Sequence, residues 1–132
     1  MWPVTGRIAD LERFGSFEPV EVLYDFDGPR TFTHRDRDGE LCLAHWCDGD
    51  AEGTRFVVAA VTEEQVQKLK KGELTLREAL DQPRVWVVDL APSGEPRHAW
   101  VLRRLLDLPP DVLPRPGTML LPSLEKRASR ES

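Results

Sequence analysis

The stretch of sequence that decides the fold runs from Val20 to Val61 and reads VEVLYDFDGPRTFTHRDRDGELCLAHWCDGDAEGTRFVVAAV. Apolar and polar side chains alternate along it, and three clusters rich in aspartate and glycine interrupt the alternation. Alternation with a period of two is typical of β-strands, and such clusters are typical of turns. The stretch therefore predicts four successive antiparallel strands, at residues 20–26, 30–35, 40–47 and 54–61.

The side-chain patterns of the first and last of these strands carry further expectations. In the first strand one apolar row is expected to be half-buried, and it consists of Val20, Val22, Tyr24 and Phe26. The last strand, at residues 54–61, is apolar on both faces near its end. Both faces of such a strand need cover, so we expect it at the centre of the sheet or in a dimer contact.

Two short helices are predicted after these strands by two capping boxes. Thr62 places a hydroxyl at a helix start, with Gln65 three residues later. Thr75 and Glu78 repeat this arrangement, which predicts a second helix. Gly72 is placed to end the first helix, because glycine readily adopts the left-handed conformation found there.

The rest of the chain completes a predicted α+β fold. A further strand is predicted at residues 85–90, whereas residues 99–106 fit a strand or a helix equally. The first eighteen residues fit a short helix or a lead-in strand. We therefore predict an antiparallel β-meander of four to six strands with two short helices packed on it.

One domain is expected over residues 1–122, with its core at residues 20–106 and a proline-rich arm at residues 107–122. Five prolines between residues 109 and 122 favour extended, polyproline-like chain in this arm. Residues 123–132 are charged and small, which predicts a disordered C-terminal tail.

The composition predicts a globular protein of the cytoplasm. The chain is 40% hydrophobic and 31% charged, which excludes wholesale disorder. It has neither a secretion signal at its start nor the apolar run of about 20 residues that a membrane span needs, so no membrane partner is expected. The net charge of −5 argues against a nucleic-acid partner, because such binding needs a surface that neutralises phosphates.

Neither a disulfide nor a metal site is predicted, and no cofactor is expected. Cys42 and Cys47 are five residues apart, so a regular strand would place the two thiols on opposite faces. The loop from Asp48 to Gly53 matches the first half of a calcium-binding loop, but Phe56 and Ala59 stand where the later ligands belong. An acidic hairpin turn is the favoured interpretation of this loop.

No catalytic residue is predicted, and the candidate binding residues are Tyr24, Asp27, Arg30, His34, His45 and Trp100. The first three surround the Asp27-Gly28-Pro29 turn at one end of the sheet. The two histidines lie on strands that flank one hairpin, although a half-buried strand histidine explains each of them. Trp100 is a candidate contact for a partner because tryptophan is enriched at binding hot spots. Trp46 and Trp86 are expected in the core.

A family resemblance is carried by the string Tyr24-Asp25-Phe26-Asp27-Gly28-Pro29, followed by Phe32, Gly39, Leu41, Trp46, Val61-Thr62, Leu69, Gly72 and Leu76-Arg77-Glu78-Ala79. Together these residues resemble a family of small bacterial domains of unknown function that open with a Tyr-(Asp)-Gly-Pro hairpin. The similarity covers about residues 20 to 90. It implies the same fold and a bacterial cytoplasmic origin, and it implies no catalytic residue because no activity is established for that family.

Two hypotheses of function follow. The preferred one is a non-catalytic accessory or protein-interaction module that binds another protein or itself. It rests on the double-sided apolar strand, the proline-rich arm and the lack of a convergent reactive site. The alternative is a small metal-dependent hydrolase that uses loop carboxylates with His34 or His45. This alternative requires the acids and a histidine to converge in one cleft, because acid–base catalysis needs hydrogen-bond reach.

Overall fold

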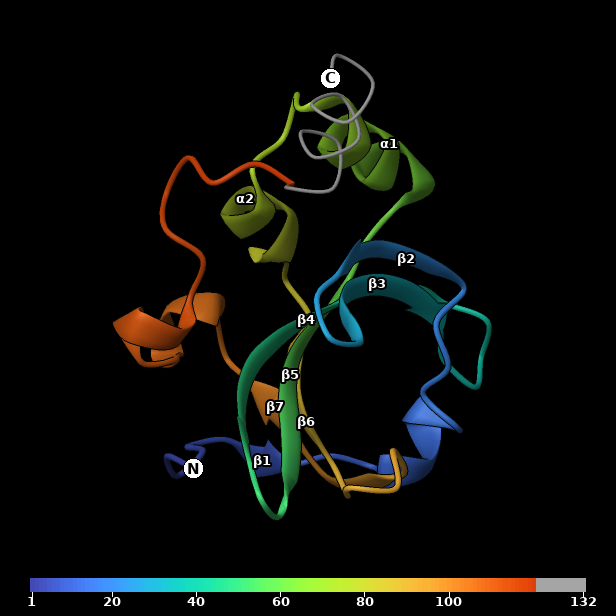
Figure 1. Ribbon diagram of the computed structural model, residues 1–132, viewed down its shortest axis with the longest axis vertical. Helices are drawn as coiled ribbons and strands as arrows, with labels where there is room; N and C mark the ends of the chain where they lie inside the picture. The colour runs from blue at the N-terminus through green and yellow to red at the C-terminus, as the bar shows by residue number, and fades with distance from the viewer. Residues whose placement is uncertain (121–132) are drawn as a thin grey trace.

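The computed structural model describes residues 1–120 and shows a seven-stranded antiparallel sheet (Figure 1). From one edge to the other, the order is β1 (Arg7–Ile8), β7 (Pro96–Leu102), β6 (Val85–Leu90), β5 (Gly53–Ala60), β4 (Leu41–Asp50), β3 (Pro29–Arg35) and β2 (Glu21–Asp25). Strands β2 to β7 are therefore a meander, and β1 is added beside β7. The predicted α+β meander is confirmed, but the sheet has seven strands where four to six were expected.

The additional strands come from the two segments whose patterns fitted either structure. The segment at residues 99–106 divides, because β7 ends at Leu102 and the 3₁₀ turn η2 (Leu105–Asp107) follows. Near the N-terminus, β1 pairs Arg7 with Val101, and the 3₁₀ helix η1 (Leu11–Phe14) comes after it. A strand of two residues is too short to have a periodic pattern, so only its pairing reveals it.

Both predicted helices are present, and both capping boxes are formed. In α1 (Glu63–Lys71), the Thr62 hydroxyl accepts a hydrogen bond from the Gln65 N–H at 3.1 Å, and Gly72 ends the helix with a φ of 78°. In α2 (Leu76–Leu80), the Thr75 hydroxyl accepts from the backbone of Glu78 at 3.2 Å. Within the described chain, none of the helices is both long and apolar enough to cross a membrane.

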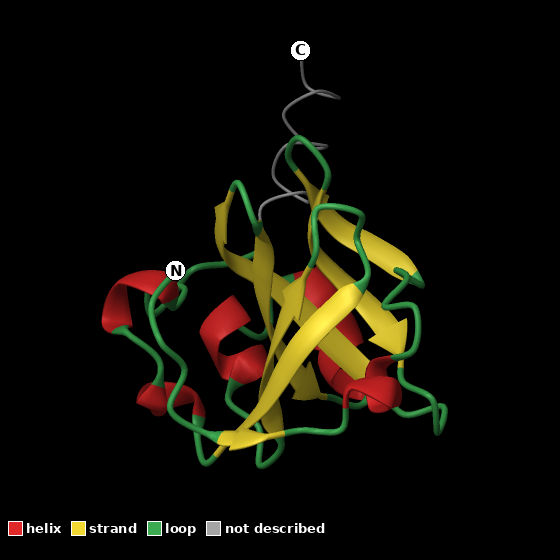
Figure 2. Ribbon diagram, turned by 90° about the horizontal axis from the view of Figure 1, so that it is seen from below, coloured by secondary structure: helices red, strands yellow, loops and turns green. Residues whose placement is uncertain are grey.

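The sheet is strongly curled and buries side chains on both faces (Figures 1 and 2). One face, the helix face, packs against α1, α2 and the chain that follows β7. The other, the aromatic face, curls around the segment that precedes β2. The side chains Phe14, Phe17, Phe32, Phe56 and Trp86 are buried together on this face.

The apolar pattern of β5 is explained by its place in the sheet. It is the fourth of the seven strands, so it lies at the centre. Val57 belongs to the helix face and Val58 to the aromatic face, and both side chains are 0% exposed. The expectation of a central strand is therefore confirmed, and the pattern needs no dimer contact.

The apolar row expected in the first strand is more exposed than its sequence pattern predicts. Val20, Val22 and Phe26 are 64%, 42% and 66% exposed, although they were expected to be half-buried. Leu23, from the opposite row, is 5% exposed and joins the core of the helix face. Irregular pairing with β3 on both sides of Tyr24 breaks the alternation, and an edge strand has a neighbour on one side only.

The bounds of two other segments also differ from those expected. Strand β4 continues to Asp50, because Asp48, Gly49 and Asp50 pair with β5 beyond a bulge that follows Trp46. The proline-rich arm is not extended throughout, since it contains the 3₁₀ turn η3 (Pro110–Val112). The end of that arm and the predicted disordered tail at residues 123–132 lie outside the described residues.

A buried ion pair joins β5 to β6 on the helix face. Arg55 donates from Nε to Asp89 Oδ1 at 2.6 Å and from Nη2 to Oδ2 at 2.8 Å. The guanidinium also donates to the Trp2 carbonyl oxygen, and its Cζ lies 4.5 Å from the ring centroid of Trp2 and 5.4 Å from that of Trp100. Trp100, a candidate binding residue, thus helps to hold the N-terminal segment on the sheet.

The variant Asp89→Leu is expected to lower the free energy of unfolding by about 3–5 kcal/mol, because it leaves the Arg55 guanidinium buried without its carboxylate. The double variant Arg55→Met with Asp89→Leu is expected to recover most of that loss, since it removes both charges. Equilibrium unfolding in urea measures both. A single variant as stable as the parent protein contradicts the prediction.

Candidate functional site

The structure brings three of the six candidate binding residues to one pocket. Tyr24, Arg30 and His45 line a pocket of about 420 Å³ together with Phe26, Trp46, Cys47 and residues 111–114 of the arm. We call it the tip pocket, because it lies at the turn between β2 and β3. Asp27 is in that turn, where its φ of 56° is a left-handed conformation that aspartate tolerates better than most residues.

Arg30 is held at the tip pocket by one hydrogen bond and one aromatic ring. Its Nε donates to the Phe26 carbonyl oxygen at 2.8 Å. The guanidinium lies over the Trp46 ring, with Cζ 4.4 Å from the ring centroid. Within residues 1–120, neither Nη1 nor Nη2 has an acceptor. A guanidinium fixed in this way offers a planar pair of donors, the geometry that suits a carboxylate.

His45 offers a neutral donor at the same pocket. Its Nδ1 lies 2.8 Å from Oγ1 of Thr31, a buried hydroxyl with no other partner among the described residues. Among these residues, the buried Thr31 hydroxyl can donate its proton only to Nδ1, so Nδ1 must be the unprotonated nitrogen of the ring. We therefore assign the imidazole proton to Nε2. Burial lowers the pKa of His45 to about 4, and the ring is therefore uncharged at neutral pH.

His34 is on the aromatic face, away from the tip pocket. It pairs across the strands with Cys42, and its ring lies 4.6 Å from that of Phe17, centroid to centroid. Both ring nitrogens are buried, and within residues 1–120 neither has a hydrogen-bond partner. Burial lowers the pKa of His34 to about 4, against smaller opposing effects of the Arg35 backbone and of the Asp36 carboxylate. This histidine is therefore a neutral core residue.

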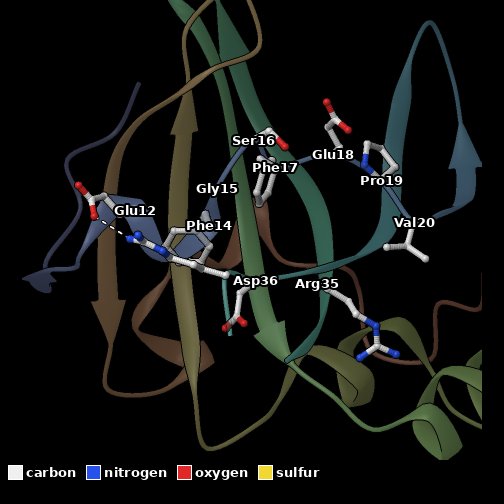
Figure 3. A pocket seen from close by; sticks show the side chains of 11 residues that line it. Glu12, Phe14, Gly15, Ser16, Phe17, Glu18, Pro19, Val20, Arg35 and Asp36 are labelled. Carbon is white, nitrogen blue, oxygen red and sulfur yellow. Dashed lines mark hydrogen bonds and ion pairs between the residues drawn. The ribbon is translucent and has the colours of Figure 1, made fainter. Parts of the chain in front are cut away.

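A second hollow, of about 700 Å³, lies over the aromatic face between residues 12–20 and residues 35–37 (Figure 3). We call it the loop pocket. Arg37 on its rim pairs with Glu12 at 2.7 Å, and Arg35 pairs with Glu63 at 3.2 Å. Phe17, which lines it, has a φ of 56°, an uncommon and strained conformation for an aromatic residue. Because its arginines are already paired, the loop pocket offers fewer free polar groups than the tip pocket.

The loop carboxylates serve the turns in which they lie. Oδ1 of Asp36 accepts hydrogen bonds from the backbone of Asp38 and Glu40, both at 2.9 Å. Oδ1 of Asp50 accepts from the backbone of Glu52 at 2.8 Å. In the part of the chain that the structure describes, no three His, Cys, Asp or Glu side chains are grouped as metal ligands. The convergence that the hydrolase hypothesis requires is therefore not found among these residues.

Both cysteines are free and buried. Burial raises the pKa of Cys42 and of Cys47 to about 12, so both remain thiols at neutral pH. Cys47 donates from Sγ to the Arg55 carbonyl oxygen at 3.4 Å. A thiol with so high a pKa is a poor nucleophile, so the pair of Cys47 and His45 does not form an activated dyad.

A model of a family of unknown function, DUF6575, matches residues 11–88. The chain belongs to the DUF6575 family. The match contains every candidate binding residue except Trp100, and it begins nine residues earlier than the resemblance at residues 20–90 that the sequence indicated. No curated protein and no solved structure matches this DUF6575 chain.

Two parts of the tip pocket of this DUF6575 protein were missed by the sequence analysis. Trp46 was assigned to the core, yet it is half-buried and supports the Arg30 guanidinium. The other part is the arm, whose residues 111–114 close one side of the pocket. Arg30 and Trp46 lie on the neighbouring strands β3 and β4, next to the pair Thr31–His45, so their contact depends on the register between the two strands, which no local pattern reports.

The variant His34→Phe is expected to reduce the acid sensitivity of this DUF6575 protein. With a folded pKa of about 4 and an ordinary value of 6.5, His34 takes up a proton more readily in the unfolded chain. The free energy of unfolding therefore falls as the pH decreases from about 6.5 towards 4, by up to about 1.4 kcal/mol per pH unit. Phenylalanine keeps a ring among the aromatic side chains and removes this contribution.

Urea unfolding at about pH 7 and about pH 5 measures the difference. His45 has a lowered pKa of the same origin, so His34→Phe is expected to remove only part of the pH dependence. Equal losses of stability in the parent protein and in His34→Phe contradict the prediction.

Proposed function

We propose that this domain is a non-catalytic interaction module of a bacterial cytoplasmic system, and that it binds an extended segment of another protein along β2. The observation that carries the proposal is the exposure of three apolar side chains in or next to the edge strand β2, namely Val20, Val22 and Phe26. Proteins without a partner usually protect such an edge, since its unpaired backbone groups can accept a further strand. Addition of a peptide strand to an exposed edge is a common mode of protein recognition.

The charges along this edge favour a basic partner over a second copy of the chain. Glu21 pairs with Lys70 at 2.7 Å, whereas Glu18, Asp25 and Asp27 are exposed acids beside the apolar row. Antiparallel pairing of two copies about Leu23 would place Glu21 opposite Asp25. Like charges in directly opposed positions are unfavourable, so a segment that carries Lys or Arg between apolar residues fits better.

The cellular setting in this proposal has separate support. Cys42 and Cys47 are free and buried, which suits a reducing compartment because small secreted domains usually pair their cysteines. The bacterial part rests on the resemblance of the Tyr24–Pro29 hairpin to a family of bacterial domains. No specific observation on the described residues supports the alternative of a metal-dependent hydrolase, and we do not propose it.

The variant Val22→Lys is expected to weaken binding of a basic extended peptide about tenfold or more, because it removes apolar contact and adds a repelling charge. The probe is a synthetic peptide of alternating valine and lysine. Its binding is followed by the backbone amide shifts of the protein in a nuclear magnetic resonance titration. The shifts are expected at residues 20–26. A peptide of alternating valine and glutamate is expected to bind much more weakly.

The matched control is Ile8→Lys, which makes the same change at an 86% exposed residue of the opposite edge. It is expected to leave binding of the peptide unchanged. If both variants weaken peptide binding equally, the peptide is attracted by the net charge of the protein alone, and the proposal is overturned. Light scattering that shows a dimer of the parent protein, lost in Val22→Lys, would replace the proposed partner with a second copy.

A further inference from the structure

The tip pocket holds two hydrogen-bond donors that the described chain does not use. One is the outer edge of the Arg30 guanidinium, and the other is the Nε2–H of His45. Neither has an acceptor within residues 1–120, although both residues are half-buried. Their orientations are fixed by hydrogen bonds to Phe26 and Thr31, so they are prepared for an acceptor that comes from outside.

The walls of the tip pocket are apolar and largely aromatic. Tyr24, Phe26 and Trp46 come from the strands and the turn, and residues 112–114 come from the arm. The volume of about 420 Å³ is at the small end of the range for ligand pockets. Aromatic rings in such walls favour a flat group that can stack on them or meet their edges.

We propose that the tip pocket binds a small molecule that carries one carboxylate on a flat apolar body. The carboxylate accepts from the outer nitrogens of Arg30, and the apolar body lies between the aromatic walls and the arm, with the neutral His45 ring as one further wall. Asp111 also lines the pocket, so a second negative charge on the ligand is repelled. This site is separate from the β2 edge that carries the proposed function, although Phe26 belongs to both.

The probe for this proposal is 1-naphthoate, with 1-naphthamide as its neutral analogue and acetate as a carboxylate without an apolar body. Binding is followed by backbone and side-chain shifts in a nuclear magnetic resonance titration up to roughly millimolar concentrations. The expected result is that naphthoate shifts the signals of Tyr24, His45 and Trp46, and that it binds about tenfold or more tightly than either analogue.

Arg30→Gln is expected to weaken binding of naphthoate about tenfold or more and to leave the weak binding of naphthamide within about twofold. Arg30→Lys keeps the charge but loses the planar fork, so an intermediate loss is expected. The matched control is Arg37→Gln, which removes the same charge at the rim of the loop pocket. It is expected to leave naphthoate binding unchanged.

Three results would overturn the proposal. The first is that naphthoate causes no chemical shifts at the tip pocket. The second is that naphthoate and naphthamide bind with equal affinity. The third is that Arg30→Gln and Arg37→Gln weaken naphthoate binding equally. The two proposals fail separately, because Val22→Lys is expected to leave naphthoate binding unchanged. Likewise, Arg30→Gln is expected to leave binding of the basic peptide at β2 unchanged.

Discussion

The need to cover both faces of β5 determines how the rest of the chain is arranged. The helices and the arm cover one face, and the segment before β2 covers the other with Phe14 and Phe17. This second cover has energetic costs, because Phe17 takes a left-handed conformation and His34 is buried with no partner among residues 1–120 for its ring nitrogens. The burial of several aromatic rings offsets them, since each ring removes a large apolar area from water.

How much of the fold could be predicted depended on whether its signals were local. The two capping boxes and the strand at Val85–Leu90 are each contained in a few neighbouring residues, and all appear where expected. Pairing of β1 with β7 joins residues far apart in the sequence, so no local pattern reports it. The exposed row of β2 was assigned wrongly for a related reason, because alternation shows two rows and not which one is covered.

The candidate site was predicted in part. Tyr24 and Arg30 flank one turn, so their proximity follows from the hairpin. The register between β3 and β4 pairs Thr31 with His45, and odd-numbered residues of both strands therefore share a face. That register brings His45 to the tip pocket and sends His34 to the opposite face. A shift by one residue would change this assignment, and the sequence did not determine the register that closely.

The aromatic face also imposes an order of events during synthesis. Phe14 packs edge-on against Trp86, with ring centroids 5.8 Å apart, yet Trp86 is made 72 residues later. At ordinary rates of translation this interval is about 4 to 14 seconds. Phe17 can meet Phe32 of β3 and Phe56 of β5 within this interval, whereas Phe14 lacks Trp86 until its end. In a nascent chain the edge-on contact that Phe14 makes in the folded protein therefore forms only after β6 has left the ribosome.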